Sequence, residues 1–164
     1  DDAGRCIGYV RRYSDGSKKT NQGGSTGVFY ASEWWSHPGP LFVVEGGSDV
    51  AACESNGLCS IGRASNTNGG ECIRRMIKKP YVSKNKKVIV VAERDENPSK
   101  RGDPKVPSCT VDCKGCSYCW PGLFGAQKVA EELNASCVLI PPGYKDMREL
   151  LSKGGLWLDL VKLF

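Results

Sequence analysis

Short apolar runs that alternate with amphipathic segments constrain this 164-residue chain most strongly. The longest runs are LFVVE (41–45), KVIVVAE (87–93) and CVLIPP (137–142), and a shorter one is LCSI (58–61). The segments between them, such as NGGECIRRMIKK and GAQKVAEELN, have the apolar spacing of helices. Buried strands that alternate with helices predict a mainly parallel sheet covered on both faces, and therefore an α/β fold.

The segments around this α/β pattern suggest how the chain is divided. RCIGYVRRYSDGSKK predicts a hairpin around Asp15-Gly16, and GVFYA predicts a further short strand. We therefore expect a small β-rich subdomain and linker over residues 1–39, and an α/β domain over residues 40–164. DMRELLSKGGLWLDLVKLF predicts one or two closing helices. Residues 97–121 exceed an ordinary βα loop, which predicts a functional or metal-stapled insertion.

Composition limits the class of protein and its compartment. The formal net charge of +5 favours a polyanionic partner only slightly. No apolar run approaches the roughly 20 residues of a membrane helix, and no leader pattern is present, so we expect a cytoplasmic protein without a membrane partner. The start without Met suggests a domain excised from a larger protein. Nine cysteines, an odd number, indicate reduced thiols rather than a disulfide framework.

Acidic residues follow the apolar runs. Glu45 ends the first run, Glu93 and Asp95 follow the third, Asp146 follows the last, and Asp49 begins a helix. Ligands of open parallel sheets bind beyond the carboxyl ends of the strands, so we expect these acids to collect at one sheet edge. Clustered carboxylates raise one another's pKa unless a cation compensates, which favours bound Mg²⁺ or Mn²⁺. Asp49 and Asp146 have a second interpretation, as helix caps.

Four cysteines lie within eleven residues of the insertion, in the pattern Cys109-x3-Cys113-x2-Cys116-x2-Cys119. Four thiolates are the ligand set of a structural zinc site, and Gly115 gives the backbone freedom to wrap an ion. Three alternatives stay open. The first three cysteines match the spacing that binds an iron–sulfur cluster in radical SAM enzymes, and the four could also form disulfides or remain free thiols.

Several of these stretches together resemble a known family. VVEGGSDVAA, VIVVAERDEN, GLFGAQKVAEEL and LIPPGYKDMRELL are similar to the Toprim domain, most of all to that of bacterial-type primases and of the primase-helicases of phages and mobile elements. The β-rich start resembles the subdomain that precedes Toprim in those proteins. The resemblance implies a Rossmann-like sheet. It also implies that Glu45 is the general acid/base and that Glu93 and Asp95 are the metal-binding pair, with Glu93 standing where the family has Asp.

The resemblance implies a catalytic core that makes RNA primers on single-stranded DNA from nucleoside triphosphates. A helicase domain or partner and a replication-associated, nucleoid location would go with it. Arg63, in the glycine-rich stretch GRASNTNGG, and Lys145 are candidate phosphate contacts, with solvated surface as the alternative. A Toprim nuclease or topoisomerase fragment is the second functional interpretation, and a non-catalytic RecR-type DNA-binding module is the third.

Overall fold

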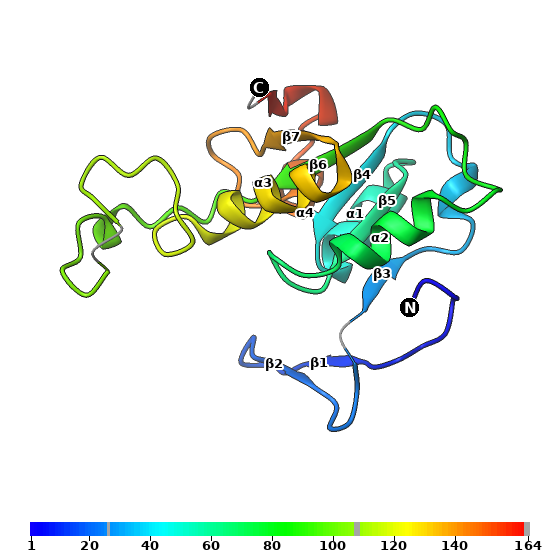
Figure 1. Ribbon diagram of the computed structural model, residues 1–164, viewed down its shortest axis with the longest axis horizontal. Coiled ribbons are helices and arrows are strands. Elements are labelled where there is room, and N and C mark those ends of the chain that lie inside the picture. Colours follow the sequence, from blue (N-terminus) through cyan, green and yellow to red (C-terminus); the bar gives the residue numbers. More distant parts are fainter. Residues whose placement is uncertain (26, 107–108, 163–164) are drawn as a thin grey trace.

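The computed structural model describes residues 1–25, 27–106 and 109–162, and its centre is one mostly parallel sheet (Figure 1). Six strands lie in the order β3-β5-β4-β6-β7-β8: β3 (Val28–Tyr30), β5 (Ser60–Arg63), β4 (Leu41–Glu45), β6 (Val88–Ala92), β7 (Ser136–Leu139) and β8 (Val161–Lys162). The four inner strands are parallel, and β3 and β8 are antiparallel to their neighbours. The predicted α/β fold with a mainly parallel sheet is confirmed, and it is compatible with a Rossmann-like architecture.

Helices cover both faces of the sheet. On one face α1 (Gly47–Ser55) packs against α4 (Met147–Ser152), and on the other α2 (Gly70–Ile77) packs against α3 (Pro121–Leu133). Figure 1 shows α2 and α3 on the near side of the strands. Each helix of the α/β body follows a strand of the sheet, as the alternating apolar runs predicted.

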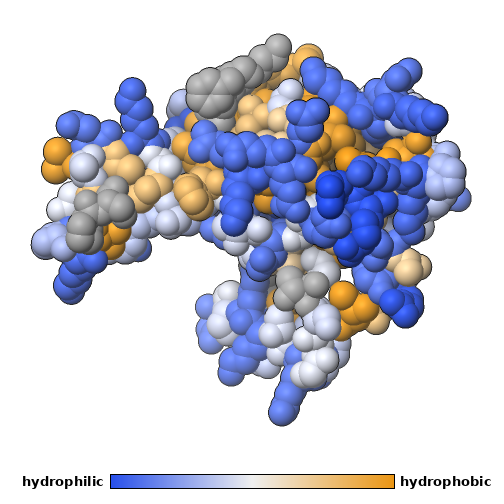
Figure 2. All heavy atoms as spheres, viewed as in Figure 1, coloured by the Kyte–Doolittle hydropathy of each residue, from blue (hydrophilic) through white to orange (hydrophobic). Residues whose placement is uncertain are grey.

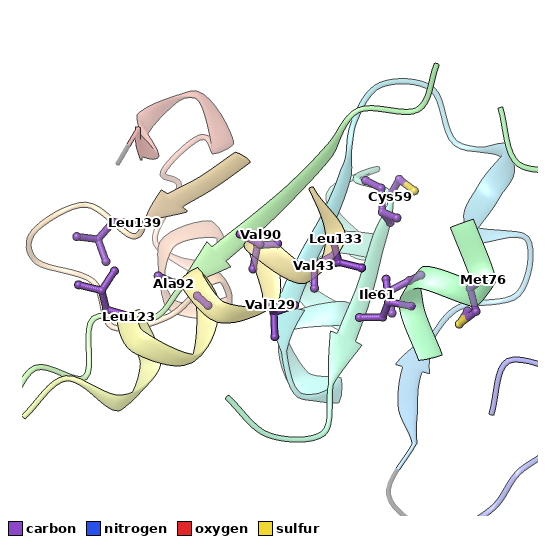
Figure 3. Packing of buried hydrophobic residues seen from close by; sticks show 14 of the residues in the cluster. Val43, Cys59, Ile61, Met76, Val90, Ala92, Leu123, Val129, Leu133 and Leu139 are labelled. Carbon is purple, nitrogen blue, oxygen red and sulfur yellow. The ribbon is translucent and has the colours of Figure 1, made fainter. Parts of the chain in front are cut away.

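The apolar strands are buried on both faces because helices lie on both. Along β4, Leu41 and Val43 belong to the core under α2 and α3, whereas Phe42 and Val44 belong to the core under α1 and α4. Figure 3 shows Val43 and Val90 close to Val129 and Leu133 of α3. Full burial of such a side chain stabilises the fold by about 1.5–3 kcal/mol, so the strands that carry the site are among its most firmly held parts.

The N-terminal hairpin is confirmed. β1 (Val10–Arg12) pairs with β2 (Lys18–Thr20) in a separate two-stranded sheet, and Gly16 supplies the positive φ of 81° in the turn. The structure differs from the expected division at residue 39, because β3 pairs with β5 in the main sheet. Trp34, in the short 3-10 helix η1 (Trp34–Ser36), is buried in the same core. Residues 28–39 therefore belong to the α/β body.

The prediction of helices up to the C-terminus is wrong beyond α4. Gly154 has a φ of 80° and follows the end of α4, and the chain then forms η3 (Trp157–Asp159) and strand β8 along β7. Pairing of β8 satisfies backbone groups that β7 would otherwise expose, an interaction that helical periodicity does not register. Residues 163–164 of the predicted helices lie outside the described residues.

The cysteine-rich insertion joins β6 to α3 and extends away from the sheet (Figure 1). Within its described residues, the 3-10 turn η2 (Pro98–Lys100) is the one helical element and there is no strand. Figure 2 shows a mixed surface on this part, with hydrophilic and apolar residues side by side. Across the described chain, no helix combines the length and the apolar character that crossing a bilayer would take.

Candidate active site and metal centre

The strand order places a topological switch point at the carboxyl edge of the sheet. From β4 the chain passes to β5 on one side, and it later returns to β6 on the other side of β4. Such a switch of direction separates the loops that leave β4 and β6, and ligands of α/β proteins bind in the opening. Glu45 is the last residue of β4, and Glu93 is the first residue after β6. The two predicted catalytic glutamates therefore flank the switch point.

Glu45 is half-buried beside a buried arginine. Its side chain is 28% exposed, and Oε2 lies 3.9 Å from Nη2 of Arg63. Burial raises the pKa of Glu45, Arg63 opposes that rise, and the negative charge of Asp95 adds to it. In a carboxyl group with a raised pKa, the ionised form is costly. A nearby cation therefore stabilises such a group more than it stabilises an ordinary carboxyl group, because it offsets that cost.

Arg63 lies inside the protein rather than in a loop. It is the last residue of β5, its side chain is fully buried, and its guanidinium donates to the carbonyl oxygens of Val91 (3.3 Å) and Asn66. In this position it ties the end of β5 to β6 and faces Glu45, so it does not reach a phosphate in solution. The sequence interpretation failed because GRASNTNGG was taken as loop throughout, whereas its first two residues complete a strand.

Glu93 is a strongly perturbed acid of this edge. Burial raises its pKa to about 8, with further increases from the charges of Glu45, Asp49 and Asp146. Lys145 is exposed, and its ammonium group lowers the pKa of both Glu45 and Glu93, so it lies within electrostatic range of both. Of the two predicted phosphate contacts, Lys145 is the one that is exposed and within electrostatic range of both glutamates.

Asp95 is held by the first turn of α3. The Gly122 amide donates to both carboxylate oxygens, at 3.0 Å to Oδ1 and 3.1 Å to Oδ2. A Cβ at this position would lie 2.7 Å from Oδ1, so a residue larger than glycine would displace the Asp95 carboxylate. Gly122 was not identified from the sequence. The Pro121-Gly122 pair at a helix start, where Pro commonly occupies the first position, is the signal that could have pointed to it.

Asp146 and Asp49 both contact the start of α4. Asp146 caps the helix by accepting from the Glu149 amide (2.8 Å), so the capping interpretation is confirmed. Asp49 is 2% exposed, and its Oδ1 accepts from the Arg148 amide (3.2 Å). It does not cap its own helix, whose N-cap Gly46 makes no side-chain bond. Burial and the charge of Asp146 raise the pKa of Asp49 to about 7.

We call these five acids the acidic edge: Glu45, Asp49, Glu93, Asp95 and Asp146. The charges of other acids in this group contribute to the raised pKa values of Glu45, Asp49 and Glu93, which places the five in one electrostatic neighbourhood. Within residues 1–25, 27–106 and 109–162, however, the only group of three or more potential ligands gathered tightly enough to share one ion is the cysteine cluster. Direct coordination by three acids would therefore require side-chain rotation towards the ion.

The four predicted cysteine ligands converge. The sulfurs of Cys109, Cys113, Cys116 and Cys119 all lie within 4.8 Å of one another, with 3.7 Å between Cys116 and Cys119 and 3.6 Å between Cys119 and Cys113. Four sulfurs bound at about 2.3 Å to a tetrahedral zinc ion are about 3.8 Å apart, which matches these separations. All nine cysteines of the chain are free, so the disulfide alternative is not found. The cluster is compatible with a structural zinc site.

Backbone amides prepare this cluster for a cation. The amides of Tyr118 and Cys119 donate to the sulfur of Cys116 at 3.4 and 3.5 Å. These bonds lower the pKa of the Cys116 thiol to about 6 and so favour the thiolate, the form that binds metal. Cys109 and Cys119 are buried, and Cys113 and Cys116 are half-buried.

The β1–β2 hairpin carries exposed tyrosines next to cations. Tyr9 and Tyr13 are 52% and 44% exposed, Arg11 lies 5.4 Å from the Tyr9 ring centre, and Lys19 lies 5.6 Å from that of Tyr13. Arg11 and Lys19 are directly opposite in the strand register, a like-charge pair that destabilises a hairpin. Lys18 of the same strand lowers the pKa of Glu45, so the hairpin lies within electrostatic range of the acidic edge.

Comparison of the chain with protein-family models, with curated proteins and with solved structures finds no match. The resemblance to Toprim therefore rests on the sequence motifs themselves.

Proposed function

We propose that this chain is a Toprim-type catalytic domain that carries out metal-dependent nucleotidyl transfer, and that it makes RNA primers on single-stranded DNA. The observation that carries the proposal is the position of Glu45 and Glu93 on the two sides of the switch point, with Asp95 two residues further along the chain. In open α/β sheets this is where substrates bind. The motif order of the Toprim resemblance falls on the same residues.

The electrostatics of the acidic edge support a divalent cation as the cofactor. Glu45, Asp49 and Glu93 all have raised pKa values, and burial is the largest cause for each. Nearby cations, Arg63 and Lys145 at the two glutamates and Arg148 at Asp49, only partly offset this. A hard cation with oxygen ligands, Mg²⁺ or Mn²⁺, would stabilise the ionised forms of all three.

The residues then have distinct roles in the proposed reaction. The cation would neutralise phosphate charge and orient the attacking 3′-hydroxyl. Glu93 and Asp95 supply ligand oxygens, and Arg63 holds the β5 and β6 ends together beside Glu45. Glu45, with its raised pKa, accepts the proton of the attacking hydroxyl, since a base whose pKa lies nearer neutrality transfers protons more effectively. Lys145, within electrostatic range of both glutamates, contacts the triphosphate.

Glu93 departs from the Asp of the family pattern, and its surroundings suit the longer side chain. Asp95 is already fixed by Gly122, so the adjustment to an ion's position falls on Glu93. The extra methylene lets the carboxylate move by about one bond length, at the cost of less strict octahedral geometry. We therefore expect Mn²⁺ to serve at least as well as Mg²⁺.

The cysteine cluster is proposed to hold one zinc ion with a structural role. Four thiolates fill the tetrahedron and leave no open position for water or substrate. Structural zinc binding supplies about 10–16 kcal/mol in small zinc-dependent folds, enough to offset the entropy of ordering an insertion with little regular structure. An iron–sulfur cluster of the radical SAM type would leave Cys119 without a role, although its sulfur lies among the other three.

The hairpin is proposed to contact the DNA template. Arg11 and Lys19 would pair with phosphates, which removes their mutual repulsion, and Tyr9 and Tyr13 would stack on bases. Basic grooves with aromatic platforms bind single strands in this way. Lysines on an uncovered hairpin commonly serve to block aggregation. That role would account for the lysines here but not for the two exposed tyrosines.

Primer synthesis by the full-length protein tests the proposed function. The assay supplies a single-stranded DNA template, nucleoside triphosphates and Mn²⁺ or Mg²⁺. Glu45→Gln should reduce the rate at least a hundredfold, because it removes the base without changing the shape of the side chain. Glu131→Gln, an exposed change near the far end of α3, is the matched control. If Glu45→Gln primes at the wild-type rate, the acidic edge is not the active site.

A further inference from the structure

The segment that carries the predicted metal ligands is hydrogen-bonded to the segment that leaves the cysteine cluster. The Trp120 indole N–H donates to the Glu93 carbonyl oxygen (3.2 Å), and the Asn97 amide donates to the Cys119 carbonyl oxygen (2.7 Å). Between them, Asp95 is bound by the Gly122 amide. Alternate residues of 93–97 are thus bonded to residues 119–122, and we call this contact the exit clamp.

The exit clamp continues directly into the cysteine cluster. Cys119 is both a cluster member and a clamp residue, and the Trp120 amide donates to the Cys116 carbonyl oxygen (3.0 Å). The Arg94 guanidinium lies 5.6 Å from the centre of the Trp120 ring, which adds a contact at the position between the clamp residues Glu93 and Asp95. The sulfur of Cys119 is therefore one residue away from the indole that fixes the backbone of Glu93.

The clamp also brings the Asp95 carboxylate so close to Gly122 that a side chain at position 122 would collide with it. Gly122 could not carry even a methyl group without meeting Asp95 Oδ1 at 2.7 Å. Within the described residues, nothing else in 97–120 except η2 has regular structure, and the cysteine cluster joins residues 109–119 at the far end of the clamp. Four thiolates this close repel one another unless a cation neutralises them.

From these contacts we infer that zinc at the cysteine cluster controls the affinity of the acidic edge for its divalent cation. Zinc fixes Cys119 and Trp120, these residues fix the backbone of Glu93 and Asn97, and Gly122 orients Asp95. Loss of zinc releases the clamp and leaves both acids free to move away from the ion. The inference rests on the proposed cation site at the acidic edge, and it makes zinc a regulator of that site as well as a structural element.

The test compares Mn²⁺ affinity, measured by electron paramagnetic resonance, in four proteins that all contain Glu93 and Asp95. These are the zinc-loaded wild type, a zinc-free Cys113→Ser/Cys116→Ser variant, Gly122→Ala and the control Glu131→Gln. Mn²⁺ prefers oxygen ligands, so it reports on the acids and not on the thiolates. We expect Mn²⁺ binding at least tenfold weaker without zinc and at least fivefold weaker in Gly122→Ala. Gly122→Ala and Glu131→Gln should retain one zinc, and Glu131→Gln should bind Mn²⁺ as the wild type does.

If the zinc-free variant fails to fold, Gly122→Ala still tests the clamp through which zinc would act, because alanine suits a helix and leaves the cysteines intact. Hydrogen exchange at the Gly122 amide should be faster in the zinc-free protein, a readout that does not depend on Mn²⁺. Mn²⁺ affinity within twofold of the wild type in both variants would overturn this inference alone. Absence of Mn²⁺ binding by the zinc-loaded wild type would instead contradict the proposed cation site, on which the inference depends.

Discussion

Asp49→Asn should stabilise the protein at high pH and do so much less at low pH. Asp49 is 2% exposed and its pKa is raised from 3.8 to about 7, so the folded state holds its proton more tightly than the unfolded state. Folding therefore disfavours ionisation of Asp49, and the penalty grows as pH rises from about 4 to about 7 and then levels off. Asparagine removes the charge and keeps an oxygen that accepts from the Arg148 amide.

The size of the effect follows from the two pKa values. Between pH 5 and pH 8 the penalty on Asp49 increases by roughly 2–3 kcal/mol, at 1.36 kcal/mol per pKa unit. The assay is urea unfolding of zinc-loaded wild type, Asp49→Asn and the control Glu131→Gln at both pH values, without added Mg²⁺ or Mn²⁺. The stability advantage of Asp49→Asn should increase by that amount between pH 5 and pH 8, and saturating Mn²⁺ should reduce it. An advantage that is the same at both pH values, or a loss of stability at pH 8, would refute this reasoning.

Three further predictions concern the other sites. Protein purified under reducing conditions without chelator should contain one zinc per chain, and Cys119→Ala should lose that zinc. Metal analysis that finds no zinc in the wild type would contradict the proposed zinc site. By calorimetry, Glu93→Asp should keep or raise Mn²⁺ affinity, and Glu93→Ala should lower it at least tenfold. The Mn²⁺ affinity of the wild type should rise between pH 6 and pH 8 as Glu93, with its pKa of about 8, ionises. An affinity that does not change with pH would count against Glu93 as a ligand. Tyr9→Ala with Tyr13→Ala should weaken binding of single-stranded DNA at least tenfold by fluorescence anisotropy, and unchanged affinity would exclude the hairpin as the template contact.

The parallel sheet was predictable because its strands are buried on both faces, and continuous runs such as LFVVE record that burial directly. The positions of Glu45 and Glu93 followed from the same runs, since each comes at a strand end. The cysteine cluster was predictable from spacing alone. In each case the information lies within a short stretch of the chain.

The features that were missed depend on contacts between distant segments. Arg63 is buried because β6 and Glu45 lie beside it, and nothing in the adjacent glycine-rich stretch indicates this. Asp49 contacts the start of α4, ninety-nine residues further on, rather than its own helix. β3 and β8 join the main sheet as antiparallel edges, and the turn after Gly154 replaces a helix that periodicity favoured. Local patterns do not record partners of this kind.

The most direct test of the central claim is the location of Mn²⁺ by anomalous diffraction from crystals soaked in Mn²⁺ at pH 8, where the raised pKa values permit ionisation. We expect an anomalous peak between the ends of β4 and β6, with an oxygen of Glu93 and at least one oxygen of Glu45 or Asp95 as ligands. No peak at the acidic edge, with Mn²⁺ bound elsewhere on the protein, would rule out the proposed cation site.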